Sequence, residues 1–181
     1  MILKNRRELI ELFEKQNYKI GIEVGVRDGL FSKYILNNTT VDKLILIDPW
    51  EANIELREPE IAYNECIKNI KTFNSRAEMV KGYSPQISKN FEDLSYDFIY
   101  IDALHDYKSV KDDIIAWYPK VRNGGILSGH DYDEKAWPGV FKAVNEFAEK
   151  HSYIVNITNI ESPDREIEHD GFRKSWFIFK K

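Results

Sequence analysis

The sequence is short of cysteine, of long apolar runs and of positive charge, and each shortage excludes something. With Cys66 as its one cysteine, the chain cannot close an internal disulfide, so we expect a reducing, cytoplasmic location. No apolar run approaches the roughly 18 residues of a membrane span, and residues 1–8 lack the apolar core of a signal peptide. The net charge is −4 and the basic residues are scattered along the chain. We therefore expect neither a membrane nor a nucleic-acid partner.

Apolar patterns of strand and helix alternate along most of the chain. We expect strands at 20–25, 44–47, 77–81, 96–101, 126–128, 153–157 and 176–179, and helices at 3–15, 30–36, 61–73, 87–94, 107–118 and 140–151. This alternation is typical of an α/β fold with a mostly parallel sheet, here one domain over 1–181 with an N-terminal helix within 1–16. The last two strands have no helix between them, so we expect an antiparallel pair at the sheet edge. Asn123, Gly124 and Gly125 are expected to form a turn.

The loop after the first of these strands has the composition of a nucleoside-binding turn. Gly25 would let the backbone turn tightly beside a ligand, and Gly29 opens the next helix. Asp48 ends the following strand, where a carboxylate can accept both hydroxyls of a ribose. Arg27 stands where dinucleotide enzymes have a second glycine, and Glu23 would repel phosphate. The pattern favours a ligand that lacks a diphosphate and carries an ammonium or a sulfonium.

Two later strands each end in an acid and a histidine. One strand ends at Asp102 and is followed by His105, and the other ends in His130 and Asp131. In an open α/β sheet, ligands bind at the carboxyl ends of the strands. We therefore expect a functional site there, and the simpler alternative is that Asp131 only caps a turn.

These stretches resemble the motifs of class I S-adenosylmethionine-dependent methyltransferases. The run I-G-I-E-V-G-V-R-D-G-L-F-S is similar to their first motif, and I-L-I-D-P-W is similar to their ribose-binding strand. The block D-F-I-Y-I-D-A-L-H-D-Y, followed by G-G-I-L-S-G-H-D-Y, resembles the branch that includes macrocin-type sugar O-methyltransferases. The resemblance implies a Rossmann-like open sheet with helices on both faces, with S-adenosylmethionine as the cofactor. It also implies a divalent metal, commonly magnesium, and a hydroxylated small-molecule acceptor such as a sugar, a glycoside or a polyketide-like compound.

The resemblance further implies a role for each candidate residue. The implied cofactor-binding residues are Glu23, Gly25, Gly29, Asp48, Tyr83, Ser84 and Asp102. Glu23, Gly25 and Gly29 would surround the methionine part of the cofactor. Asp48 would bind the ribose, and Tyr83 and Ser84, which follow the third parallel strand, would lie near the adenine. The implied metal ligands are Asp102, Asp131 and His130, because a hard cation relieves the repulsion between two facing carboxylates. The implied catalytic residues are Asp102 and His105, with His105 as the general base that deprotonates the acceptor hydroxyl.

Several alternatives stay open. A metal-independent methyltransferase would use Asp102 and His105 only to shape the pocket, and a non-catalytic module would bind the cofactor and act through a partner. A nicotinamide oxidoreductase is disfavoured by Arg27 and by Glu23. Trp50 would either stack on the cofactor or pack in the core.

The remaining expectations concern the acceptor and the surface. The acceptor is expected to contact Tyr132 and the polar segments 50–60, 132–138 and 158–173. Asp112 and Asp113 are expected on the solvated side of their helix. The chain has no obvious extra domain to enclose an acceptor, so a homo-oligomer would complete a pocket that is otherwise open.

Overall fold

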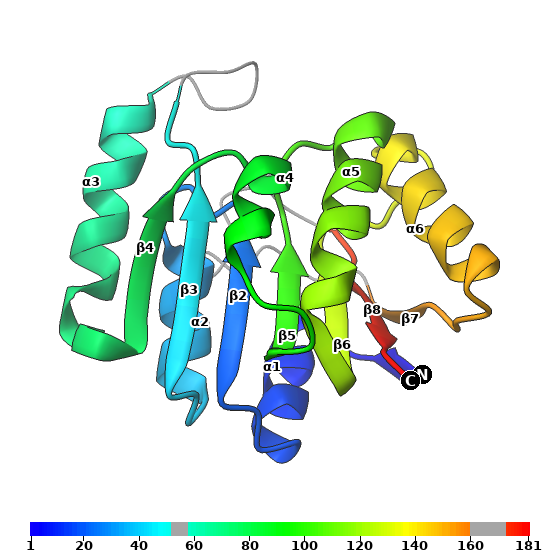
Figure 1. Ribbon diagram of the computed structural model, residues 1–181, viewed down its shortest axis with the longest axis horizontal. Helices are drawn as coiled ribbons and strands as arrows, with labels where there is room; N and C mark the ends of the chain where they lie inside the picture. Colours follow the sequence, from blue (N-terminus) through cyan, green and yellow to red (C-terminus); the bar gives the residue numbers. More distant parts are fainter. Residues whose placement is uncertain (52–57, 160–172) are drawn as a thin grey trace.

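The computed structural model of the protein describes residues 1–51, 58–159 and 173–181. Within them, eight strands form one sheet in the order β1-β7-β8-β6-β5-β2-β3-β4 (Figure 1). The strands are β1 Ile2–Leu3, β2 Ile20–Val24, β3 Lys43–Asp48, β4 Ala77–Lys81, β5 Tyr96–Ile101, β6 Val121–Gly129, β7 Asn156–Thr158 and β8 Trp176–Phe179. The α-helices are α1 Arg6–Lys15, α2 Leu30–Asn38, α3 Pro59–Ile70, α4 Ser84–Ile87, α5 Tyr107–Trp117 and α6 Pro138–Lys150. None of the helices in these ranges is long and apolar enough to cross a membrane.

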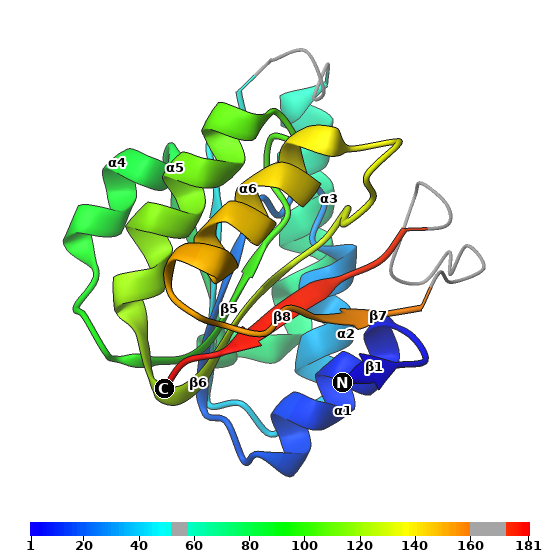
Figure 2. The same ribbon diagram turned by 90° about the vertical axis from the view of Figure 1, so that its right-hand side faces the viewer.

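Helices cover both faces of the sheet, because successive side chains of a strand point to opposite faces. In β3, Leu44 and Leu46 belong to the apolar cluster that includes α1, α2 and α3. Ile45 and Ile47 belong to the cluster on the other face, which includes α5 and α6 (Figure 2). A strand that is apolar on both faces is buried on both, as in a parallel sheet. The predicted Rossmann-like open sheet with helices on both faces is therefore confirmed.

The direction of the strands follows from their connections. The five strands from β2 to β6 pair parallel in the order β4, β3, β2, β5, β6. Strand β8 runs antiparallel to both β6 and β7, so the predicted antiparallel pair of the last two strands is present. Strand β1 lies outside that pair, with Ile2 parallel to Ile157. Residues 2–3 are thus a strand, and the helix predicted from residue 3 begins at Arg6, where the Asn5 side chain accepts a hydrogen bond from the Glu8 amide.

Two further expectations were wrong in position. The helix predicted at 87–94 is instead α4, which begins at Ser84 with Pro85 in its first turn and passes into a 3₁₀ turn at 88–90. The turn predicted at Asn123–Gly125 lies inside β6, where the register against β5 shifts between Tyr96 and Phe98. The backbone stays in the sheet because the Gly124 amide donates to the carbonyl oxygen of Lys180 at 2.8 Å, a residue 56 positions later in the chain.

Candidate active site

The carboxyl ends of the parallel strands open into one cavity of about 540 Å³. Its wall is formed by the loops after β2, β3, β4, β5 and β6, and by the first turn of α1. This is the edge at which ligands bind in open α/β sheets. The site predicted at the strand ends and the nucleoside loop predicted after the first parallel strand therefore share one cavity.

The loop after β2 approaches the end of β5 too closely for any side chain at Gly25. A Cβ there would lie 2.1 Å from the carbonyl oxygen of Asp102, and the Gly25 φ of +86° is in the region that favours glycine. Gly29 precedes α2 with a φ of +74°, and a Cβ there would lie 2.9 Å from the Cys66 sulfur. Gly25 lines the cavity, whereas Gly29 is outside its lining, and close packing against Asp102 and Cys66 explains both glycines. Ligand contact by either glycine stays a prediction.

Asp48 holds the same loop by its backbone. One carboxylate oxygen, Oδ2, accepts hydrogen bonds from the amides of Val26 at 3.0 Å and Arg27 at 2.9 Å. The other oxygen, Oδ1, accepts from the Trp50 amide at 2.7 Å. Burial raises the pKa of Asp48, and these three amides oppose that rise. The residue predicted to bind ribose thus also fixes the loop, and lone pairs remain on the oxygens for a ligand.

Trp50 packs in the core and does not line the cavity. Its side chain is 3% exposed, its indole Nε1 donates to the Arg27 carbonyl at 2.8 Å, and its ring meets Tyr63 edge-on at 5.2 Å. Of the two roles left open for Trp50, the structure favours packing.

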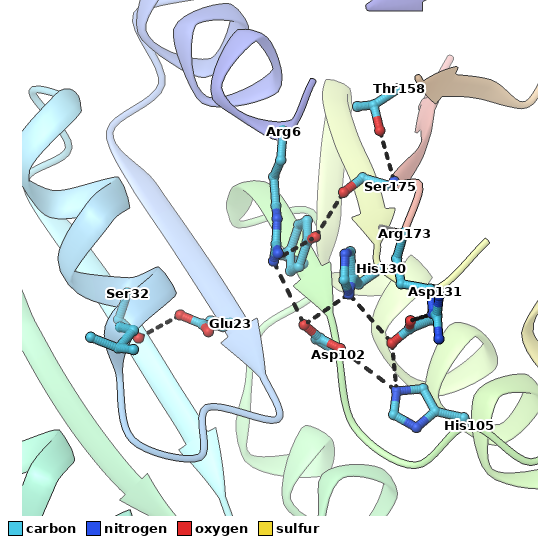
Figure 3. Close-up of polar contacts among 12 residues, drawn as sticks. Arg6, Glu23, Ser32, Asp102, His105, His130, Asp131, Thr158, Arg173 and Ser175 are labelled. Atoms are coloured by element: carbon cyan, nitrogen blue, oxygen red, sulfur yellow. Dashed lines mark hydrogen bonds and ion pairs between the residues drawn. The ribbon is translucent and has the colours of Figure 1, made fainter. Parts of the chain in front are cut away.

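Glu23 is a buried acid in the cavity wall. It is 2% exposed, and the Ser32 hydroxyl of α2 donates to its Oε2 (Figure 3). Burial raises the pKa of Glu23 to about 8, and the hydrogen bond from Ser32 opposes this. At neutral pH the acid is therefore mostly protonated, and a cationic ligand group beside it would favour its ionised form.

The residues predicted near the adenine form a polar cluster with an unexpected member. Tyr83 is half exposed and donates to Glu51 at 2.6 Å. The Ser84 hydroxyl donates to Asp113 of α5 and accepts from the Trp117 indole at 2.7 Å. Asp113 is 3% exposed, so its predicted place on the solvated side of the helix was wrong. Burial raises the pKa of Asp113 to about 7.

Asp102, His105 and Asp131 converge at the other end of the cavity (Figure 3). His105 Nε2 lies 2.8 Å from Asp131 Oδ2 and 3.8 Å from Asp102 Oδ1. The three residues come together because β5 and β6 are adjacent, with Ile101 paired to Gly129. The indole ring of Trp137 lies against the His105 ring at 4.3 Å between centroids, which restricts rotation of the imidazole.

Each carboxylate turns its second oxygen toward a guanidinium. Asp102 Oδ2 lies 3.9 Å from Arg6 Nη1, and Asp131 Oδ1 lies 3.5 Å from Arg173 Nε. His130 Nδ1 lies 3.3 Å from Asp131 Oδ2. Burial by itself would raise the pKa of Asp131, but hydrogen bonds from the two histidines and their charge outweigh it and hold that pKa well below its usual range.

The donor set fits a hard divalent cation. One ligand atom each from Asp102, His105 and Asp131 lies within 4.8 Å of the other two, and the two carboxylate oxygens suit magnesium or manganese, while the imidazole nitrogen is a softer ligand. The structure groups His105 with the acids, where the sequence pattern named His130. His130 as a metal ligand stays a prediction.

Comparison with known proteins identifies the family. A family model described as a methyltransferase domain matches residues 22–132, more than half of the chain. The chain belongs to this methyltransferase family. The matched region runs from the glycine loop through the block that carries Asp102, His105 and Asp131. Membership in the macrocin-type branch stays a proposal.

Individual relatives of this chain are distant. The uncharacterized protein R132 of Acanthamoeba polyphaga mimivirus is 30% identical over 148 residues, which are 80% of this chain but 64% of that protein, less than two thirds of its length. An O-methyltransferase from Bacillus cereus, solved in complex with SAH, has a TM-score of 0.68 at 17% identity. The match covers 96% of this chain and 80% of the Bacillus cereus chain. A spermidine synthase from Thermotoga maritima has a TM-score of 0.68 at 21% identity, and the match covers 95% of this chain and 56% of the synthase chain. These two structures support the fold alone.

Sequence reasoning missed two buried charged residues of the cavity, Arg6 and Asp113. A signal for both was present. Arg6 shares the spacing i, i+3, i+4, i+7 with Leu9, Ile10 and Phe13, the other buried residues of α1. Asp113 stands in the same way on the buried stripe of α5, with Val110, Ile114 and Trp117. In both helices, a charged residue at a position of the apolar stripe indicated a buried charged side chain.

The residues predicted to contact the acceptor are only partly described. Positions 52–57 and 160–172 of those segments lie outside the described residues. The Tyr132 hydroxyl hydrogen-bonds with the side chain of Asn145 on α6, at 3.1 Å to Oδ1. Contact between Tyr132 and an acceptor stays a prediction.

Proposed function

We propose that this protein is an S-adenosylmethionine-dependent O-methyltransferase acting on a hydroxyl of a small molecule, such as a sugar, a glycoside or a polyketide-like compound. The observation that carries the proposal is the imidazole of His105, held between Asp102 and Asp131 in the same cavity as the Gly25 loop and Asp48. A nucleoside-binding loop and a positioned base in one cavity are the two parts that methyl transfer to a hydroxyl needs.

The chain's own residues account for the proton. The acceptor oxygen attacks the methyl carbon, the carbon–sulfur bond breaks, and the hydroxyl proton must leave. His105 Nε2 lies 2.8 Å from Asp131 Oδ2, and the imidazole of His105 is the group that takes the proton. Asp131 then stabilises the imidazolium that forms, as a buried carboxylate does beside a catalytic histidine.

A divalent metal, with magnesium as the first choice, is part of the proposal. Asp102 and Asp131 would hold it, with His130 as the third ligand that the family resemblance implies. When bound, such an ion lowers the pKa of a hydroxyl that it touches. The closeness of one carboxylate oxygen of Asp102 to one of Asp131, within 4.8 Å, supports this part of the proposal.

A metal-independent methyltransferase is the second candidate, and the arginines favour it. Arg6 and Arg173 already offer one positive charge to each carboxylate. The repulsion between two facing acids is therefore reduced without an ion. Under this alternative Asp102 only shapes the pocket.

The test is methyl transfer from methyl-labelled S-adenosylmethionine to a panel of glycosides and polyketide-derived alcohols. His105→Gln should lower turnover by about 10²- to 10⁴-fold, the usual contribution of a general base. The control His151→Gln alters an exposed histidine outside the cavity and should leave turnover unchanged. Tight binding of S-adenosylhomocysteine without transfer to any acceptor would instead support a non-catalytic module.

Chelation separates the two enzymatic candidates. Activity that disappears in EDTA and returns with Mg²⁺ supports metal assistance. Activity that survives complete metal removal supports the metal-independent candidate.

The cellular setting is also a proposal. We infer a cytoplasmic protein because the one cysteine of this chain is buried and has no partner cysteine. We expect a small-molecule acceptor in place of a nucleic acid or a membrane, and a second subunit where the pocket needs closing.

A further inference from the structure

Arg6 places a buried positive charge in the wall of the cavity. Its side chain is 2% exposed, yet it borders the same cavity as Glu23, Gly25 and Asp102. Figure 3 shows the Arg6 side chain descending from α1 toward Asp102. A guanidinium is rarely buried without an anionic or hydrogen-bonding role, because removing the charge from water is costly.

The surrounding residues hold the Arg6 guanidinium in one place. Its Nη1 lies 3.4 Å from the Tyr100 hydroxyl, which in turn lies 2.9 Å from the Ser175 hydroxyl on the way into β8. Its central carbon sits 4.5 Å from the centre of the Phe31 ring. These contacts come from α1, β5, α2 and the β8 segment, so the charge is fixed relative to the sheet edge.

Arg6 lines the cavity beside Asp102. The 3.9 Å between Arg6 Nη1 and Asp102 Oδ2 is an ion-pair distance and exceeds a hydrogen bond. A guanidinium has five N–H donors in a planar fork that matches a carboxylate. A carboxylate of a ligand in the cavity can therefore bind the guanidinium of Arg6 while Asp102 stays in contact with Arg6.

Arg6 and Glu23 together complement an α-amino acid. Glu23 is an acid on β2 and Arg6 a base on α1, and the two are close enough for the charge of Arg6 to act on the carboxyl of Glu23. An α-amino acid carries an ammonium and a carboxylate on one carbon. The donor proposed above ends in such a group, and this is the part that the Gly25 loop is expected to surround.

We propose that Arg6 binds the carboxylate of the donor's methionine group and selects that donor over its decarboxylated counterpart. This inference rests on the proposed function, since it assumes S-adenosylmethionine as the donor. It assigns to Arg6 a role in ligand recognition beyond its contact with Asp102.

The experiment compares two ligands by calorimetry: S-adenosylhomocysteine, and the same thioether without its carboxylate, S-adenosyl-3-thiopropylamine. The wild-type protein should prefer S-adenosylhomocysteine by about 10- to 100-fold, the range of a charge-assisted hydrogen-bond pair. Arg6→Met keeps the apolar stem over Phe31 and should weaken S-adenosylhomocysteine by that factor while leaving the amine unchanged. Arg7→Met is the matched control, because Arg7 is also on α1, lies over the Tyr34 ring and does not line the cavity; it should behave as wild type.

Comparing the two ligands distinguishes a failure of the role of Arg6 from a failure of the proposed function. Equal affinity of the wild-type protein for both would overturn the role of Arg6 and leave the proposed function standing, because the donor product still binds. A preference that persists in Arg6→Met would overturn it too. If Arg6→Met loses affinity for both ligands equally, Arg6 has only a structural role and the inference fails. If the wild-type protein binds neither ligand, the proposed function falls and the inference with it.

Discussion

Replacing Asp48 by asparagine tests how the first loop of the cavity is held. The carboxylate accepts hydrogen bonds from three buried or half-buried backbone amides, two on Oδ2 and one on Oδ1. Asparagine has nearly the same shape but only one oxygen. If that oxygen takes the place of Oδ2, the NH₂ group faces the Trp50 amide; in the opposite orientation it faces the amides of Val26 and Arg27.

The cost follows from this count of bonds. A hydrogen bond to a charged group contributes about 1.5–3 kcal/mol, and a buried amide left without an acceptor costs a similar amount. Since at least one bond is lost and donor faces donor, we expect Asp48→Asn to lower the free energy of unfolding by about 2–4 kcal/mol. In a chain of this size 1 kcal/mol corresponds to about 2–4 °C, so the Tm should fall by roughly 4–16 °C.

Thermal unfolding followed by circular dichroism measures the effect, with Asp93→Asn as the control. Asp93 pairs with Lys120 at 2.6 Å, but its side chain is 64% exposed. A surface pair of this kind contributes under about 1 kcal/mol, so the control should unfold close to wild type. An Asp48→Asn protein that unfolds at the wild-type temperature would show that these three bonds do not hold the loop.

Three other predictions follow from single residues. The Glu23 pKa is raised from 4.5 to about 8 by burial, so the folded protein keeps a proton that the unfolded chain releases. This contribution to stability is complete below pH 4.5 and is lost as the pH rises toward 8. The Tm of Glu23→Gln should therefore rise relative to the Tm of wild type between pH 4.5 and pH 8. A Tm difference between the two proteins that does not change with pH would contradict the raised pKa of Glu23. Gly25→Ala should disrupt binding of S-adenosylhomocysteine in calorimetry, because its Cβ would meet the Asp102 carbonyl; Gly124→Ala has a similar φ of +79° but open space around it, so it reports backbone strain alone. The Cys66 thiol is buried and its pKa is raised by burial, so a thiol reagent should react with it only on unfolding, and rapid reaction in the native state would disagree.

Local patterns were enough for the order of the elements and for the strand ends. The run from Leu44 to Ile47 is apolar at every position, which is typical of a strand buried on both faces. Parallel strands all end at one edge, so acids placed after two such strands share that edge, and they come near each other where the two strands are neighbours. This is why Asp102 and Asp131 were predictable as a site before any distance was known.

Other features depended on contacts between residues far apart in the chain. Residues 2–3 became a strand only because β7 offers them a partner, and Gly124 stays in the sheet only because residue 180 pairs with it. The phase of a helix is equally non-local. On α5, Ile115 is 57% exposed, whereas Asp113, predicted on the solvated side, is buried against Ser84.

The sequence by itself determined the fold class, the glycine turn after the first parallel strand and the acids at the strand ends, because periodicity and strand-end position are local properties. Only the tertiary structure decided which nitrogen faces which carboxylate, that Trp50 packs and that Arg6 reaches the cavity. Those outcomes depend on how helices settle on the sheet, and that is set by packing over the whole chain.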